Sequence, residues 1–190
     1  VVPSLALGGL TYGVHNIEMC AAYAAIANQG TYTQPVYYTQ VKDKDGNVIL
    51  DNTQPLTHTV LKKSTSWLLT NALESVTAAG TAEAAALSNQ PTAGKTGTTQ
   101  DWNDLTFVGL TEDFVSGVWL GYKERSELKD HHIKSAQIWY NIIGEYADSM
   151  DTGAEYPEND KVIEGKVCAR SGKIAGPNCE ATTTGYWKSS

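Results

Sequence analysis

The chain has 190 residues, 41% of them hydrophobic and 18% charged, which argues against a disordered chain or a coiled coil and suits one domain with its own core. Fourteen basic residues against 21 acidic ones give a net charge of −7, which disfavours a protein that binds nucleic-acid phosphates. No apolar run reaches the roughly 18 residues of a membrane-spanning helix. The chain begins at Val1 without a signal peptide, so we expect a trimmed or excised piece of a longer protein.

Helices and short strands alternate along the predicted fold. Helices are predicted over residues 16–30, with Asn16 as cap and Gly30 as terminator, over 64–78 and over 135–147. Strands are predicted on both sides of the Asp45-Gly46 turn within residues 35–50, and over 93–99, 105–110 and 114–122. The predicted fold class is α+β, an antiparallel sheet covered by helices. We assign residues 1–150 to this unit and residues 151–190 to an irregular, Gly/Pro-rich tail.

Two of the three cysteines bracket a polar loop. Cys168 and Cys179 have no further Cys or His nearby to complete a zinc site, so no metal is expected. A local disulfide is the favoured interpretation and would place the chain in an oxidising compartment; two free thiols are the alternative. Such a disulfide would contribute on the order of 2–3 kcal/mol. Cys20 lies in an Ala-rich helical pattern and is interpreted as a small core residue.

The candidate functional motif is Lys95-Thr96-Gly97-Thr98-Thr99, on a predicted strand that a short turn joins to the next strand. It is not a phosphate loop, because no helix follows and the glycine spacing differs. Gly97 removes a side chain, so a ligand backbone can lie close to the strand. Backbone N–H groups at such an edge can pair with an extended peptide or face a developing oxyanion. Lys95 supplies a cation, and the hydroxyls of Thr96 and Thr98 can hold a carboxylate.

The motif resembles the third active-site motif of the serine acyltransferases that react with penicillin. Its flanks are similar to the transpeptidase domain of class A penicillin-binding proteins over nearly the whole chain. The matching segments are, in order, residues 4–9, 12–14, 18–19, 22–30, 80–82, 107–109 and 118–122, and the tail around Ser171-Gly172. Thr106 departs from the family, which often has an aromatic residue there.

The resemblance implies a peptidoglycan D,D-transpeptidase, whose serine attacks the D-Ala-D-Ala carbonyl of a stem peptide and passes the acyl group to an amine. The family also needs a Ser-x-x-Lys and a Ser-x-Asn motif before Lys-Thr-Gly. Here Ser-x-x-Lys occurs only at residues 126–129, in a predicted solvated loop after the motif, and Ser-x-Asn is absent. We therefore expect the C-terminal part of a transpeptidase domain, inactive alone, whose partner is the upstream half carrying both motifs.

The resemblance also implies residue roles. Lys95 orients the proton-transfer network and attracts the substrate carboxylate, Thr96 and Thr98 bind that carboxylate, and the Thr98 backbone N–H forms half of the oxyanion hole. Gly97, Thr99 and Trp102 complete the predicted substrate-binding set. Alternatively, Trp102 simply covers the edge of the sheet. Lys95 would point to the opposite strand face from the two threonines, so a shared groove requires the strand to lie along its edge.

The implied ligands are stem peptides and β-lactam antibiotics, with no cofactor, metal or nucleic acid. The implied location is the outer face of the bacterial cytoplasmic membrane, with an anchor outside this chain. Two alternatives stay open. A catalytically silent penicillin-binding fold acting as a β-lactam sensor or interaction domain would explain the missing nucleophile. A serine β-lactamase shares Lys-Thr-Gly, but the Gly80-Thr81-Ala82 segment and the cysteine-bearing tail disfavour it.

Overall fold

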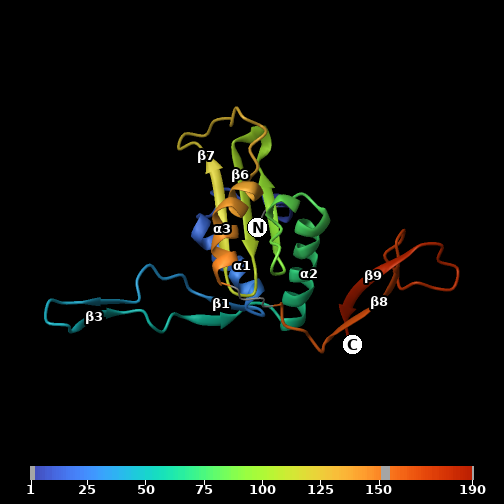
Figure 1. Cartoon of the computed structure of the whole chain (residues 1–190), viewed down its shortest axis with the longest axis horizontal. Helices are drawn as coiled ribbons and strands as arrows, with labels where there is room; N and C mark the ends of the chain where they lie inside the picture. The colour runs from blue at the N-terminus through green and yellow to red at the C-terminus, as the bar shows by residue number, and fades with distance from the viewer. Residues whose placement is uncertain (1–2, 151–154, 190) are drawn as a thin grey trace.

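The computed structural model describes residues 3–150 and 155–189. Its α-helices are α1 (Asn16–Ala27), α2 (Lys63–Ala79) and α3 (Ser135–Met150), and its 3-10 helices are η1 (Pro3–Leu7), η2 (Glu83–Ala85) and η3 (Gln100–Trp102). Its strands are β1 (Thr31–Thr33), β2 (Gln40–Lys42), β3 (Val48–Asp51), β4 (Thr57–Thr59), β5 (Ala93–Thr98), β6 (Asp104–Leu110), β7 (Val115–Gly121), β8 (Val162–Cys168) and β9 (Thr182–Lys188). Figure 1 shows a central body with an extended hairpin on either side.

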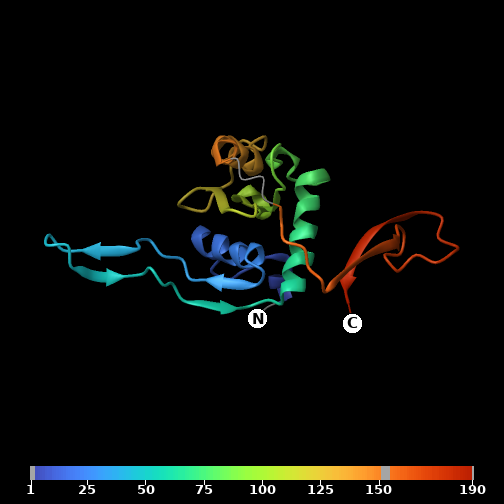
Figure 2. The same ribbon diagram turned by 60° about the horizontal axis from the view of Figure 1, so that its bottom comes forward.

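The central sheet is a meander of three antiparallel strands in the order β5-β6-β7, so the predicted strands and their antiparallel pairing are confirmed. In its register, Phe107 of β6 lies between Thr96 of β5 and Val118 of β7. Strand β6 is central, and β5, which carries the candidate motif, is an edge strand of this sheet. The two faces of the sheet are covered by different helices, with α3 above and α1 below in Figure 2. The predicted α+β class is confirmed.

The core lies between the sheet and α3. Phe107 and Trp139 are fully buried, and their rings meet edge to face with centroids 5.5 Å apart. The indole N–H of Trp139 donates to the carbonyl of Ser116 at 3.2 Å, so its polar atom is satisfied. Gly109 is needed beneath this ring, because a Cβ there would lie 2.5 Å from the indole. The same cluster includes three alanines: Ala82, which precedes η2, Ala85 in η2 and Ala136 in α3.

Helix α1 covers the other face, and its predicted capping by Asn16 is wrong. The helix begins after His15, whose backbone N–H donates to the Glu18 carboxylate at 2.7 Å. The Asn16 side-chain amide instead donates to the carbonyl of Gly117 in β7, at 2.9 Å. A Cβ at Gly117 would lie 2.6 Å from Asn16 Oδ1 and 2.8 Å from Cys20 Sγ, so this glycine allows the helix to approach the strand closely. The Asn16 side chain therefore makes a tertiary contact with β7 instead of capping its own helix.

The left-hand extension in Figure 1 contains two antiparallel strand pairs, β1 with β4 and β2 with β3. The predicted hairpin around Asp45-Gly46 is confirmed, and Gly46 has a left-handed φ of +89° in its turn. The short pair Thr31–Thr33 and Thr57–Thr59 was not predicted, because three residues are too few for an alternating pattern to show.

The predicted irregular tail is wrong for residues 162–168 and 182–188, which form the antiparallel hairpin β8–β9; residues 151–154 of that tail lie outside the described residues. Gly165 and Gly185 face each other across the hairpin. Because glycine is not typical of strands, these two positions weakened the strand pattern in the sequence. Trp187 lies over Gly165, where a Cβ would be 2.6 Å from the indole, so an aromatic ring covers the gap. The tail is held to the body by a hydrogen bond of 2.7 Å from the Tyr156 hydroxyl to the Leu110 carbonyl. The assignment of 1–150 and 151–190 as separate units stays a prediction.

Candidate active site at the open edge of β5

The candidate motif occupies the exposed end of β5. Ala93 and Gly94, at the start of the strand, are buried. Lys95 and Thr98 are exposed, and Thr96 and Gly97 are half-buried. The backbone N–H of Thr99, one residue beyond the strand, donates to the Asp104 carbonyl at 3.1 Å and therefore points toward β6. Because N–H groups point alternately to the two sides of a strand, the N–H of Thr98 points away from β6. The sheet thus presents this donor at its open edge.

Lys95 reaches the same edge. Its ammonium donates to the carbonyl oxygen of Thr96 at 3.1 Å. That carbonyl, by the same alternation, also points away from β6. Lys95 leaves the opposite strand face from Thr96 and Thr98, as the sequence predicted, yet its ammonium lies at the edge that both faces share. A groove along this edge can therefore use all three residues.

Thr96 connects two segments that carry the family resemblance. Its hydroxyl forms a hydrogen bond of 2.9 Å with the hydroxyl of Thr81, which belongs to the Gly80-Thr81-Ala82 segment. Gly80 ends α2, and Ala82 is buried in the core cluster. Thr81 is therefore a candidate positioning residue that sequence reasoning missed, since nothing in its local pattern reports a contact 15 residues away.

Packing within the sheet, as well as the predicted approach of a ligand, favours glycine at position 97. Gly97 pairs with Thr106 of β6, whose hydroxyl donates to the Gly97 carbonyl at 3.3 Å. A Cβ at Gly97 would lie 2.4 Å from this hydroxyl oxygen. The Thr106 side chain therefore occupies the space that the missing Gly97 side chain leaves.

The turn after β5 is tightly held. The Thr99 hydroxyl donates to the Asp104 carboxylate at 3.0 Å and accepts the Asp104 backbone N–H at 2.8 Å. The other carboxylate oxygen of Asp104 accepts the indole N–H of Trp119 at 3.0 Å. Thr99 is thus engaged in the turn, while its predicted role in binding substrate stays a prediction.

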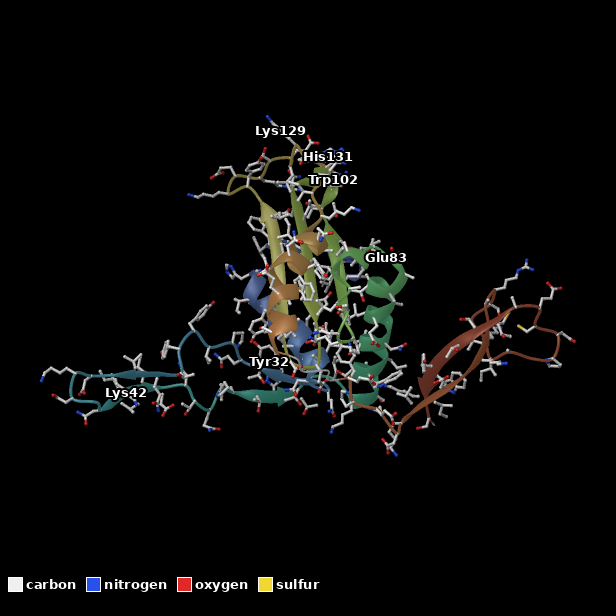
Figure 3. The ribbon with its side chains drawn as sticks, viewed as in Figure 1. Tyr32, Lys42, Glu83, Trp102, Lys129 and His131 are labelled. Atoms are coloured by element: carbon white, nitrogen blue, oxygen red, sulfur yellow. The ribbon has the colours of Figure 1, made fainter. Side chains whose placement is uncertain are left out.

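Trp102 lies in this turn with a left-handed φ of +52°. One face of its indole stacks on His131, with ring centroids 4.5 Å apart and planes inclined by 21°. Its carbonyl accepts the backbone N–H of Leu128 at 2.9 Å, and Glu127 lies 3.0 Å from His131 Nε2. Figure 3 shows Trp102, His131 and Lys129 together at the same end of the sheet. The connection from β7 to α3 therefore holds Trp102 beside the end of the motif strand.

The late Ser-x-x-Lys sequence belongs to that connection. Residues 126–129 lie outside helices and strands, so the predicted loop is confirmed. Ser126 and Lys129 are exposed, but Leu128 is only 9% exposed, which the prediction of a solvated loop did not anticipate.

Two hollows lie away from the motif. One of about 170 Å³ lies between α2 and residues 155–159, where burial and the neighbouring Glu155 raise the pKa of Glu74. Another of about 450 Å³ lies between α1 and the turn from β6 to β7. Neither includes a residue of β5, so the candidate site is an open strand edge and not one of these cavities.

The described ranges, 3–150 and 155–189, contain no group of three or more His, Cys, Asp or Glu side chains that could hold a metal ion. None of their helices is both long and apolar enough to cross a membrane.

Comparison with known proteins defines the class. The family model described as the penicillin binding protein transpeptidase domain matches residues 4–142. Penicillin-binding protein 1A of Clostridium perfringens is 31% identical over 157 residues, which cover 83% of this chain and 22% of that protein. Penicillin-binding protein 1A of Aquifex aeolicus is 38% identical over 128 residues, covering 67% of this chain and 17% of that protein.

Solved structures agree on the fold. Penicillin-binding protein 1A from Haemophilus influenzae matches with a TM-score of 0.71 and 16% identity, over 90% of this chain and 32% of that one. PonA1 from Mycobacterium tuberculosis, solved in complex with penicillin V, matches with a TM-score of 0.60 and 26% identity, over 77% of this chain and 41% of that one. The chain belongs to the penicillin-binding protein transpeptidase family. It spans 17% and 22% of the two curated relatives described above.

Proposed function

We propose that this chain forms one wall of the acyl-transfer site of a peptidoglycan D,D-transpeptidase, and that a part of the domain outside this chain supplies the nucleophilic serine. The observation that carries the proposal is the open edge of β5, where the Thr98 N–H and the Lys95 ammonium meet in a chain of this family. The complex of PonA1 with penicillin V supports a β-lactam as an alternative ligand of the same edge.

In this mechanism a stem peptide lies along β5, and the serine hydroxyl attacks the D-Ala-D-Ala carbonyl carbon while its proton passes to a base. The oxyanion that forms accepts hydrogen bonds from the Thr98 N–H and from the N–H of the serine itself. Collapse expels D-Ala, whose nitrogen takes the proton from the base. An amine from a neighbouring strand then attacks the ester and gives up a proton, and the serine oxygen leaves and is protonated again. The substrate carboxylate is held by the Lys95 ammonium and the hydroxyls of Thr96 and Thr98, since charge-assisted hydrogen bonds are roughly twice as strong as neutral ones.

The large solvent-exposed area of the chain supports the proposal that an upstream half of the domain packs against it. The chain exposes 13020 Å², whereas a compact monomer of 20.5 kDa exposes about 8,900 Å². The two extended hairpins account for part of the excess. Apolar side chains near the N-terminus add to it, with Leu7 94% and Tyr12 99% exposed. Such side chains are best explained by a covering partner, which we identify with the upstream half that carries Ser-x-x-Lys and Ser-x-Asn.

The proposed reaction indicates where in the cell the domain would act. Stem peptides are cross-linked outside the cytoplasmic membrane, so the domain would act on its outer face, with its anchor in a segment outside this chain. Trp102, seated on His131 at the end of β5, would border the groove with its other ring face.

Labelled penicillin tests this function. We would combine this chain with a polypeptide carrying both missing motifs and follow covalent labelling, with each polypeptide alone as control. We expect label on the upstream serine of the combined pair and none on this chain alone. A combined pair with intact motifs that takes up no label would refute the enzyme; reversible penicillin binding by such a pair would favour the β-lactam sensor instead.

Thr98→Val should slow penicillin acylation of the completed domain by about 10- to 100-fold, equivalent to roughly 1.4–2.7 kcal/mol. Valine keeps the shape and strand propensity of threonine but lacks the hydroxyl, and the backbone donor survives. Stopped-flow acylation measures the rate, and Thr57→Val, on the exposed strand β4, is the matched control with an unchanged rate. Acylation of Thr98→Val at the original rate would show that this hydroxyl does not hold the carboxylate.

A further inference from the structure

The turn between β5 and β6 holds two adjacent non-glycine residues in a left-handed backbone. Asp101 has a φ of +60° and Trp102 a φ of +52°. Close contact between Cβ and the backbone makes this conformation unfavourable, so such residues adopt it only where surrounding contacts hold them there. Within the turn, the Trp102 N–H donates to the Thr99 carbonyl at 3.2 Å. Further support comes from a different part of the chain.

The connection from β7 to α3 contacts Trp102 at two points. The backbone N–H of Leu128 donates to the Trp102 carbonyl at 2.9 Å, and the ring of His131 stacks on the indole with centroids 4.5 Å apart. The Leu128 side chain is buried, so this part of the connection is anchored. His131 Nε2 lies 3.0 Å from a carboxylate oxygen of Glu127, and this pair fixes the orientation of the imidazole. Figure 3 shows His131 beside Trp102 at the end of the sheet.

The direction of the ligand along β5 places this indole beside the acyl group. In the proposed function the ligand carboxylate lies between Lys95 and the hydroxyls of Thr96 and Thr98, and the oxyanion forms at the Thr98 N–H. Passing along the edge from Lys95 to Thr98 therefore leads from the ligand carboxylate to its reacting carbonyl. The part of the ligand that stays on the serine continues past Thr98, toward the turn that carries Trp102. Trp102 is half-buried, with one ring face on His131, so part of the indole remains open to that group.

We propose that His131 is a positioning residue, which holds the Trp102 indole as an apolar wall for the acyl side of the ligand. The wall favours ligands that carry an aromatic group on that side, because such a group can stack on the indole. An indole that His131 already fixes loses little freedom when the ligand binds, so less of the stacking energy is spent on ordering it. The β7–α3 connection thereby sets ligand preference at the end of the motif strand. The inference rests on the proposed function.

Two β-lactams separate this role from a general effect on the site. Penicillin V carries a phenoxyacetyl group on the acyl side of its reactive carbonyl, whereas 6-aminopenicillanic acid has the same ring system and carboxylate with a bare amine there. Stopped-flow acylation of the completed domain gives the saturating rate constant and the apparent dissociation constant for each compound. We expect Trp102→Ala to lower the preference for penicillin V about 10-fold, mainly through the dissociation constant.

His131→Ala should lower the same preference by about 3- to 5-fold, because the indole remains but is no longer held. His131→Phe should restore it to within about 2-fold, since phenylalanine keeps a ring on the indole although it cannot pair with Glu127. In a Trp102→Ala background, His131→Ala should have no further effect if it acts only through the indole. The matched control is His132→Ala, which should leave the preference unchanged, because His132 uses its backbone N–H to bond the Asp130 carboxylate at 2.9 Å.

A loss confined to penicillin V and restored by His131→Phe would support the inference. An unchanged preference in His131→Ala, or an equal loss of acylation by both compounds, would overturn it and leave the proposed function in place. If neither compound acylates the unmodified completed domain, the proposed function is wrong and the inference falls with it.

Discussion

Lys95→Ala is expected to slow penicillin acylation of the completed domain by about 100- to 1,000-fold. The structure holds the Lys95 ammonium at the open edge of β5, 3.1 Å from the Thr96 carbonyl oxygen. Alanine removes the one strong cation that this strand contributes to the substrate carboxylate and to proton transfer. The loss should therefore affect the acylation rate and leave the fold intact, since Lys95 is exposed. Acylation kinetics with labelled penicillin measure the effect.

Lys42→Ala provides the matched control. Lys42 is an exposed strand lysine of the β2–β3 hairpin, far from the motif strand in Figure 3. Its loss also removes one positive charge but should not change the rate. Equal rates for Lys95→Ala and the unmodified protein would show that the cation of the third motif is not used.

Trp139→Ala should lower the free energy of unfolding by about 3–5 kcal/mol. The indole is fully buried, meets Phe107 edge to face and satisfies its N–H on Ser116. Alanine would leave a cavity above Gly109, where the backbone already lies under the ring. Because domains are stable by only 5–15 kcal/mol, this loss is a large share of the total. Urea unfolding followed by circular dichroism measures it.

Tyr140→Ala is the comparison on the same helix. Its side chain is 37% exposed, and the change should cost about 1 kcal/mol or less. If the two substitutions destabilise the protein equally, the core does not lie between α3 and the central sheet. Should Trp139→Ala fail to fold, Trp139→Phe retains part of the buried volume and still ranks below Tyr140→Ala in stability.

The central meander could be predicted from sequence because its strands are bounded by short polar turns, and neighbouring strands pair in chain order. The same local signals identified α2, which spans Lys63–Ala79 where residues 64–78 were predicted. The tail hairpin was missed because its stability depends on Trp187 covering Gly165 across the strand pair. The cap of α1 was misassigned because Asn16 binds the carbonyl of Gly117, 101 residues away.

In the candidate site, too, local features could be predicted from the sequence and tertiary contacts could not. The motif residues were found from their types and order, and the edge position of β5 followed from the meander. The partners that orient them were not found, since the Thr81–Thr96 hydrogen bond and the stack of Trp102 on His131 are tertiary contacts. The left-handed backbone at Trp102 gave no sequence signal either, because that conformation is uncommon for a residue of this type.

A crystal structure of the completed domain acylated by penicillin tests the central claim most directly. We predict that the acyl carbonyl oxygen lies about 2.7–3.1 Å from the Thr98 backbone nitrogen. The penicillin carboxylate should contact Lys95 and the hydroxyls of Thr96 and Thr98. An acyl group bound away from β5, or a Thr98 N–H already paired with another strand of the completed domain, would contradict the account.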